Sequence, residues 1–150
     1  MLGADDEFSA AVLDASVAVR WVVTEPGSET AAELFGRQIR WVAPRLLLVE
    51  FASALRRKVL EGLITTDDAT DSMEFLLNVI ERGSIRLAAD ERIVASALQF
   101  AVSNRHRVPD CLYLALAHDE GVALVTADSR LGALAERRGI PTLLLPSSNT

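Results

Sequence analysis

A chain of 150 residues, half of them hydrophobic, is long enough to form one domain around its own core. Its single cysteine, Cys111, excludes an internal disulfide, and with only two histidines the chain has no pattern of zinc-ligand spacing. The formal net charge is −6, but it would be −2 without four carboxylates discussed below. The acidity therefore does not exclude a nucleic-acid partner.

The N-terminal residues carry no targeting signal that we recognise. Asp5, Asp6 and Glu7 stand where a secretory signal would place basic and then apolar residues. No apolar run approaches the roughly 20 residues of a membrane helix. A buried, inert Cys111 thiol is the simplest interpretation of the lone cysteine. We expect a cytoplasmic protein with no membrane association.

The hydrophobic pattern predicts short strands that alternate with helices along one domain at residues 11–146, between a polar tail at 1–10 and a C-terminal tail at 147–150. Ser16 is predicted to cap the first helix. The strands are expected at 11–13, 40–43, 84–87, 122–126 and 141–145. The helices are expected at 17–23, 29–38, 46–60, 67–81, around 93–101, at 109–120 and at 128–138.

This alternation predicts an α/β fold, with a central parallel sheet of about five short strands and helices on both faces. Functional sites in such sheets form beyond the carboxyl ends of the strands. Asp14 and Asp128 each lie just beyond the C-terminus of a predicted strand. We expect them to approach one another at that edge.

Asp14, Asp110 and Asp128 each also allow a purely structural interpretation. Asp128 begins a helix and is a natural N-cap, and Asp14 could cap the helix that starts near Ser16. Asp110 follows Pro109 in a first helical turn, where a negative charge favours the helix dipole by about 0.3–1 kcal/mol. Considered singly, none of the three requires a function.

Glu50 resists that interpretation because it lies inside a strongly apolar helix. Its neighbours three and four positions away are Leu46, Leu47, Ser53 and Ala54, so no local basic residue can neutralise it. A distant arginine could still do so. Burying an unpaired carboxylate is expensive, so several acids against core elements suggest a cation, and oxygen ligands suit Mg²⁺ or Mn²⁺.

Other reaction classes lack their motifs. The chain has no glycine-rich phosphate loop, no dinucleotide-binding glycine pattern and no Gly-x-Ser-x-Gly turn around a serine nucleophile. His106 lies near Asp110 in a basic loop, where contact with phosphate or no role is favoured over a general base.

The ordered acids and their surroundings resemble the PIN-domain family, and within it the VapC-like toxin ribonucleases of type II toxin–antitoxin systems. The matching segments are residues 12–17 with Trp21, residues 44–55 with Glu50, residues 110–117, and residues 124–128 with Leu131. One position departs from the family pattern: Ser53 stands where such proteins often carry an asparagine shortly after the helical glutamate.

The resemblance implies a PIN-like fold and Mg²⁺- or Mn²⁺-dependent cleavage of RNA, leaving 5′-phosphate and 3′-hydroxyl ends. Asp14, Glu50, Asp110 and Asp128 would be catalytic and hold the metal, and Ser16 and Thr126 would be supporting hydroxyls. It also implies a cognate antitoxin and a homodimer. Arginines near the motifs are weaker candidates for RNA phosphate contacts: Arg20, Arg45, Arg105, Arg107 and Arg130.

Two alternatives remain open from sequence. One is a catalytically silent PIN-like module that acts through a protein partner. The other is a receiver-like signalling domain, which also places acids beyond strand ends but requires a lysine after a late strand. That second alternative is disfavoured, because Lys58 is the only lysine in the chain.

Overall fold

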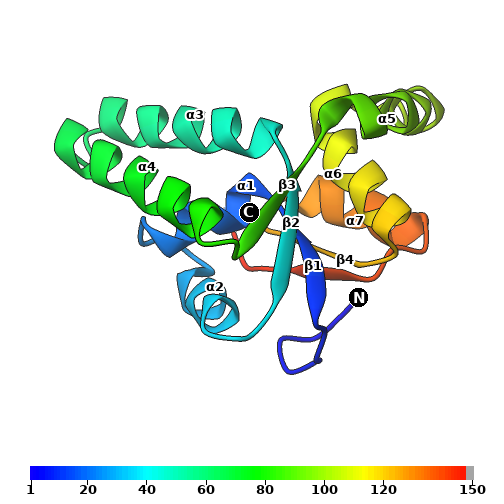
Figure 1. Ribbon diagram of the computed structural model, residues 1–150, viewed down its shortest axis with the longest axis horizontal. Coiled ribbons are helices and arrows are strands. Elements are labelled where there is room, and N and C mark those ends of the chain that lie inside the picture. Colours follow the sequence, from blue (N-terminus) through cyan, green and yellow to red (C-terminus); the bar gives the residue numbers. More distant parts are fainter. Residues whose placement is uncertain (148–150) are drawn as a thin grey trace.

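The computed structural model describes residues 1–147 and contains a five-stranded, wholly parallel sheet (Figure 1). Its order is β3-β2-β1-β4-β5, so the strand that begins the sheet in sequence lies at its centre. The strands are β1 (Ala10–Leu13), β2 (Arg40–Pro44), β3 (Ile85–Ala88), β4 (Ala123–Thr126) and β5 (Thr142–Leu144). This architecture confirms the predicted α/β fold.

Helices cover both faces of the sheet. Long connections are expected, because parallel strands can be joined only by crossovers. The elements between the strands are α1 (Ala15–Ala18), the 3-10 helix η1 (Val19–Trp21), α2 (Ser28–Phe35), α3 (Leu46–Leu60), α4 (Thr66–Glu81), α5 (Asp90–Asn104), α6 (Val108–Glu120) and α7 (Ser129–Arg137).

Two hydrophobic clusters, one on each face, hold these layers to the sheet. Alternate residues of β1 face opposite sides, so Leu13 packs with α1 to α4 while Val12 packs with α5, α6 and α7. Figure 1 shows the two groups of helices on the left and right of the sheet. Helix α6 is buried along most of its length, which explains why its sequence is apolar all round.

The strand order reverses between β1 and β4. After β1 the chain builds β2 and β3 on one side, and it then returns to place β4 and β5 on the other. Leu13 pairs with Val125, so the residues that follow these two strands emerge side by side. A crevice beyond the carboxyl ends of the strands forms at such a switch point.

The first helix differs from its prediction. It begins at Ala15 rather than residue 17, passes into η1 after Ala18, and has Asp14 at its N-cap position, without a capping bond from the side chain. The prediction that Ser16 is the cap was therefore wrong. Ser16 lies inside the first turn, and its hydroxyl donates to Asp14 Oδ2 at 2.6 Å instead.

Part of the predicted N-terminal polar tail packs against the core. Leu2 and Phe8, within the predicted polar tail, pack against the core, and the Leu2 backbone N–H donates to the Thr142 carbonyl. Residues 148–150 of the predicted C-terminal tail lie outside the described part of the chain. Within residues 1–147, none of the helices combines the length and apolar character of a bilayer-crossing segment.

Candidate active site

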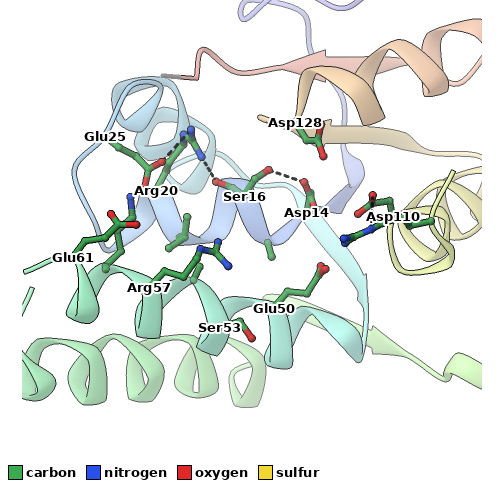
Figure 2. Close-up of a pocket in the computed structure, with 15 residues that line it drawn as sticks. Asp14, Ser16, Arg20, Glu25, Glu50, Ser53, Arg57, Glu61, Asp110 and Asp128 are labelled. Atoms are coloured by element: carbon green, nitrogen blue, oxygen red, sulfur yellow. Dashed lines mark hydrogen bonds and ion pairs between the residues drawn. The ribbon is translucent and has the colours of Figure 1, made fainter. Parts of the chain in front are cut away.

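A cleft of about 430 Å³ opens beyond the carboxyl ends of β1 and β4, and all four singled-out carboxylates line it (Figure 2). Asp14 follows β1, Glu50 lies on α3, Asp110 on α6 and Asp128 at the start of α7. Helix α3 covers one face of the sheet and α6 and α7 the other, so the carboxylates reach the cleft from both layers.

Asp14 is the most buried of the four carboxylates, with 7% of its surface exposed. Its Oδ2 atom accepts two hydrogen bonds, from the hydroxyls of Ser16 at 2.6 Å and Thr126 at 2.7 Å. Burial raises the pKa of Asp14 to about 6; the two hydroxyls oppose this shift, while the charges of Glu50 and Asp128 add to it. The two hydroxyls named by the resemblance therefore hold this carboxylate.

Ser16 and Thr126 are themselves fixed by the segment after β4. The Ala127 backbone N–H donates to Ser16 Oγ, and the Asp128 backbone N–H donates to Thr126 Oγ1. The Ala127–Ser16 bond and the bond from Thr126 to Asp14 connect the end of β1 with the end of β4. The strand pairing that forms the sheet thus also sets the position of Asp14.

Glu50 is half-buried on the α3 wall, and its Oε1 atom accepts a 2.7 Å hydrogen bond from the hydroxyl of Tyr113 on α6. Burial raises the pKa of Glu50, and the charge of Asp110 contributes in the same direction. The hydrogen bond from Tyr113 and the charges of Arg107 and Arg57 oppose that shift. No residue of α3 forms an ion pair with Glu50 within residues 1–147, as its sequence neighbours predict.

Asp110 and Asp128 both serve their helices and line the cleft. Asp128 Oδ1 accepts from the backbone N–H groups of Arg130 and Leu131, so it caps α7 as predicted. Asp110 lies in the first turn of α6, and His106 Nε2 is 3.1 Å from its Oδ2. A structural role and a place in the cleft are therefore compatible for both.

The four carboxylates line one shared space, but they are too far apart to bind a metal ion together as they stand. In Figure 2, Asp128 and Glu50 point towards Asp14 from opposite sides, and Asp110 lies across the opening. Among residues 1–147, no three acidic, histidine or cysteine side chains lie close enough together to hold a metal ion as they stand. The negative charges of Glu50 and Asp128 act on Asp14, and that of Asp110 acts on Glu50. This repulsion between carboxylates favours a cation in the space between them.

At its other end the same cleft holds paired charges. Arg20 NH2 lies 3.1 Å from Glu25 Oε1, and Lys58 Nζ lies 3.3 Å from Glu25 Oε2. Arg20 is buried and also donates to the backbone carbonyls of Ser16 and Pro26. The sequence suggests Arg20 as a contact for RNA phosphate. In the structure its guanidinium joins the loop of Glu25 and Pro26 to the segment that carries Ser16.

Three of the other four predicted arginines line a groove beside Asp110. This second groove of about 300 Å³ shares Arg107, Asp110 and Asp128 with the cleft and is also lined by Arg105, His106 and Arg130. Arg45 is exposed and does not line either cavity. Three of the five arginines thus border the continuation of the acidic cleft.

Two residues of the site were missed from sequence. Tyr113 looks like a core residue of an apolar helix, and only its being the sole tyrosine marked it. Arg57 lines the cleft one turn beyond Ser53, although it stands outside every motif. Its spacing of seven residues from Glu50, two turns along one helix face, was the available signal.

Cys111 is buried as expected, and burial raises the pKa of its thiol to about 11.

Comparison with known proteins places these features in a family. A model described as "PIN domain" matches residues 11–137. "Ribonuclease VapC12" of Mycobacterium tuberculosis is 32% identical over 122 residues, which cover 80% of this chain and 88% of the relative.

Two solved structures have the same fold. The Pyrobaculum aerophilum protein PAE2754 matches 89% of this chain and 83% of its own, with a TM-score of 0.67 and 20% identity. VapBC-5 from M. tuberculosis, described as a member of the VapBC family of toxin-antitoxin systems, matches 93% of this chain and 99% of its own, with a TM-score of 0.52 and 19% identity.

Proposed function

Since the chain belongs to the PIN-domain family, we propose that it is a metal-dependent endoribonuclease, the toxin of a toxin–antitoxin pair, with residues 11–146 as its nuclease domain. The observation that carries the proposal is the convergence of four carboxylates, from four separate elements and both helical layers, on one cleft at the switch point of the sheet. The similarity to a VapC ribonuclease supports RNA as the substrate.

The donor set fits a hard divalent cation. Asp14, Glu50, Asp110 and Asp128 offer only oxygen atoms, which suit Mg²⁺ and Mn²⁺, and no sulfur ligand lines the cleft within residues 1–147. Burial and mutual repulsion raise the pKa values of Asp14 and Glu50, so a cation would relieve an existing electrostatic cost. When bound, such an ion supplies an activated water and offsets charge on the phosphate that is cleaved.

The chain's own residues provide orientation and binding. Ser16 and Thr126 donate to one oxygen of Asp14, which leaves its other oxygen for the cleft. Arg57 borders the cleft on one side, and Arg105, Arg107 and Arg130 border its continuation on the other. We propose that these arginines contact the phosphates that flank the cleavage site, because guanidinium groups bind phosphate in a bidentate manner.

A cleavage assay tests the proposal. Asp14→Asn and Asp110→Asn should each lower RNA cleavage in Mg²⁺ or Mn²⁺ at least about 100-fold, because the amide keeps the shape but binds a cation weakly. Asp119→Asn is the matched control: Asp119 is exposed on the last turn of the same helix as Asp110 and should be replaceable without loss.

Retained cleavage by both Asp14→Asn and Asp110→Asn would contradict the nuclease proposal. Folded wild-type protein that does not cut RNA in either metal would instead favour the silent binding module. The two results are distinguishable because circular dichroism reports the fold independently of activity.

We also propose a cognate antitoxin and a homodimer. The structural similarity to VapBC-5 supports the antitoxin. Val94, Leu98 and Val102 are exposed at four-residue spacing along α5, so they form one apolar face that a protein could cover. Light scattering of the isolated chain, and of the chain with the product of an adjacent small gene, tests both associations.

A further inference from the structure

Tyr113 makes the one side-chain hydrogen bond that joins helix α6 to helix α3 among the described residues, and it makes it to a carboxylate of the cleft. The side chain is fully buried in the cluster on the α6 face of the sheet, whereas α3 belongs to the opposite face. The bond therefore crosses from one layer to the other, just beyond the strand ends.

The bond fixes the orientation of Glu50. A glutamate side chain has several rotatable bonds, and a half-exposed one samples many rotamers unless something holds it. Here Oε1 accepts from the Tyr113 hydroxyl at 2.7 Å, which leaves Oε2 as the oxygen available to the cleft. The buried Tyr113 hydroxyl, in turn, requires a hydrogen-bond partner. Breaking its bond to Glu50 would therefore cost free energy for both groups.

Helix α6 sets the geometry of two carboxylates at once. Asp110 and Tyr113 stand three residues apart and so lie on the same side of the helix. One rigid element therefore carries a carboxylate of its own and the donor that holds Glu50. The position of helix α6 therefore determines where Asp110 lies relative to Glu50, more than the rotamers of the two side chains do.

We propose that Tyr113 is a positioning residue of the site, whose hydroxyl holds the Glu50 carboxylate in the orientation that cation binding requires. The inference rests on the proposed function and adds a residue to it. Outer groups that orient a ligand in this way change metal affinity or activity about 10–100-fold when they are removed.

The test removes only the hydroxyl. Tyr113→Phe should weaken Mn²⁺ binding measured by calorimetry about tenfold and lower kcat for RNA about tenfold, while KM stays within about twofold. In a Glu50→Gln background the same change should add less than about a twofold further loss, because the hydroxyl acts through Glu50.

The matched control is Thr142→Val, which removes another fully buried hydroxyl, one that donates to the Ile140 carbonyl and is absent from the cleft lining. It should change stability without changing Mn²⁺ affinity or kcat per folded molecule.

Three results would overturn the inference. Tyr113→Phe that is less stable but has wild-type Mn²⁺ affinity and kcat would show a purely structural hydroxyl. An equal loss in the Glu50→Gln background would show that Tyr113 acts through another group. Wild-type protein that neither binds Mn²⁺ nor cleaves RNA would refute the proposed function itself, and the positioning role with it.

Discussion

The two ends of the cleft hold similar numbers of charged side chains in opposite electrostatic arrangements. At one end Glu25 lies between Arg20 and Lys58, and its carboxylate is matched by two cations. At the other end, the carboxylate end, Asp14, Glu50, Asp110 and Asp128 line one space, and among the described residues only Asp110 has ion-pair partners, His106 and Arg107. There, burial and like charges raise the pKa values of Asp14 and Glu50.

The difference separates a part of the molecule whose ion pairs stabilise the fold from a part that we propose binds a cation. A chain of contacts connects the two ends. Lys58 pairs with Glu25. Figure 2 shows the contacts that continue from Glu25 to Arg20, to the Ser16 carbonyl, and from the Ser16 hydroxyl to Asp14. The Glu25 end thus supports the position of Asp14 at the carboxylate end. Substitutions at the two ends should therefore have opposite effects on stability and activity.

The largest effect is expected at Glu50. Glu50→Gln should lower RNA cleavage at least about 100-fold, because it removes a proposed cation ligand. In chelator the variant should be at least as stable as wild type, since the substitution removes a repelled, partly buried charge. Urea denaturation and a cleavage assay on the same samples measure both. A large loss of stability with unchanged cleavage per folded molecule would show that Glu50 is structural.

The opposite pattern is expected at Glu25. Glu25→Gln leaves the buried guanidinium of Arg20 without its carboxylate, so we expect about 2 kcal/mol less stability and largely retained cleavage per folded molecule. Glu120→Gln breaks the more exposed pair with Arg86 and should change stability by less than about 1 kcal/mol. Equal effects of the two substitutions would mean that the Glu25 network is an ordinary surface ion pair.

The pH dependence of stability should reveal the raised pKa of Asp14 at the carboxylate end. Because the pKa of Asp14 is about 6 in the folded chain and near 3.8 when unfolded, the folded state binds its proton more tightly. In chelator, lowering the pH from 7.5 to 5 should therefore stabilise wild type by about 1–1.5 kcal/mol relative to Asp14→Asn. Parallel pH profiles for the two proteins would contradict this assignment.

The smallest effect is expected at Arg57, which lines the cleft two turns along α3 from Glu50. Arg57→Ala should weaken RNA binding in Ca²⁺ by about 1 kcal/mol and reduce the salt dependence of binding, because one phosphate contact is lost. Arg56→Ala removes the same charge from an exposed neighbour that does not line the cleft. If both variants bind RNA equally well, Arg57 does not contact the substrate.

The sequence could predict the sheet, the helices and the cleft that Asp14 and Asp128 border, because these follow from periodicity and from strand ends. It could not predict contacts between distant residues. The Tyr113 hydroxyl reaches Glu50 across 63 positions, and an apolar helix gives no sign of it. The sequence predicts Ser16 as a cap because serine is favoured at that position, whereas in the structure its hydroxyl donates to Asp14.

Arg20 illustrates the same limit for charge. In sequence it is one arginine among fourteen, near a motif and free to be assigned to RNA. In the structure the turn at Pro26 and Gly27 brings Glu25 against it, and the left-handed Gly27 lies where a Cβ atom would meet the Pro146 carbonyl at 2.5 Å. Such a close loop depends on tertiary packing rather than on local pattern.

Calorimetric titration with Mn²⁺ tests most directly whether the four carboxylates form a cation site. Wild type should bind Mn²⁺ and melt at a higher temperature in its presence, and chelator should reverse the shift. Asp14→Asn and Asp110→Asn should each lose at least about tenfold in affinity, while Glu120→Gln, which removes a carboxylate elsewhere, should bind as wild type does. No binding heat and no thermal shift for wild type, or equal binding by all four proteins, would contradict the account.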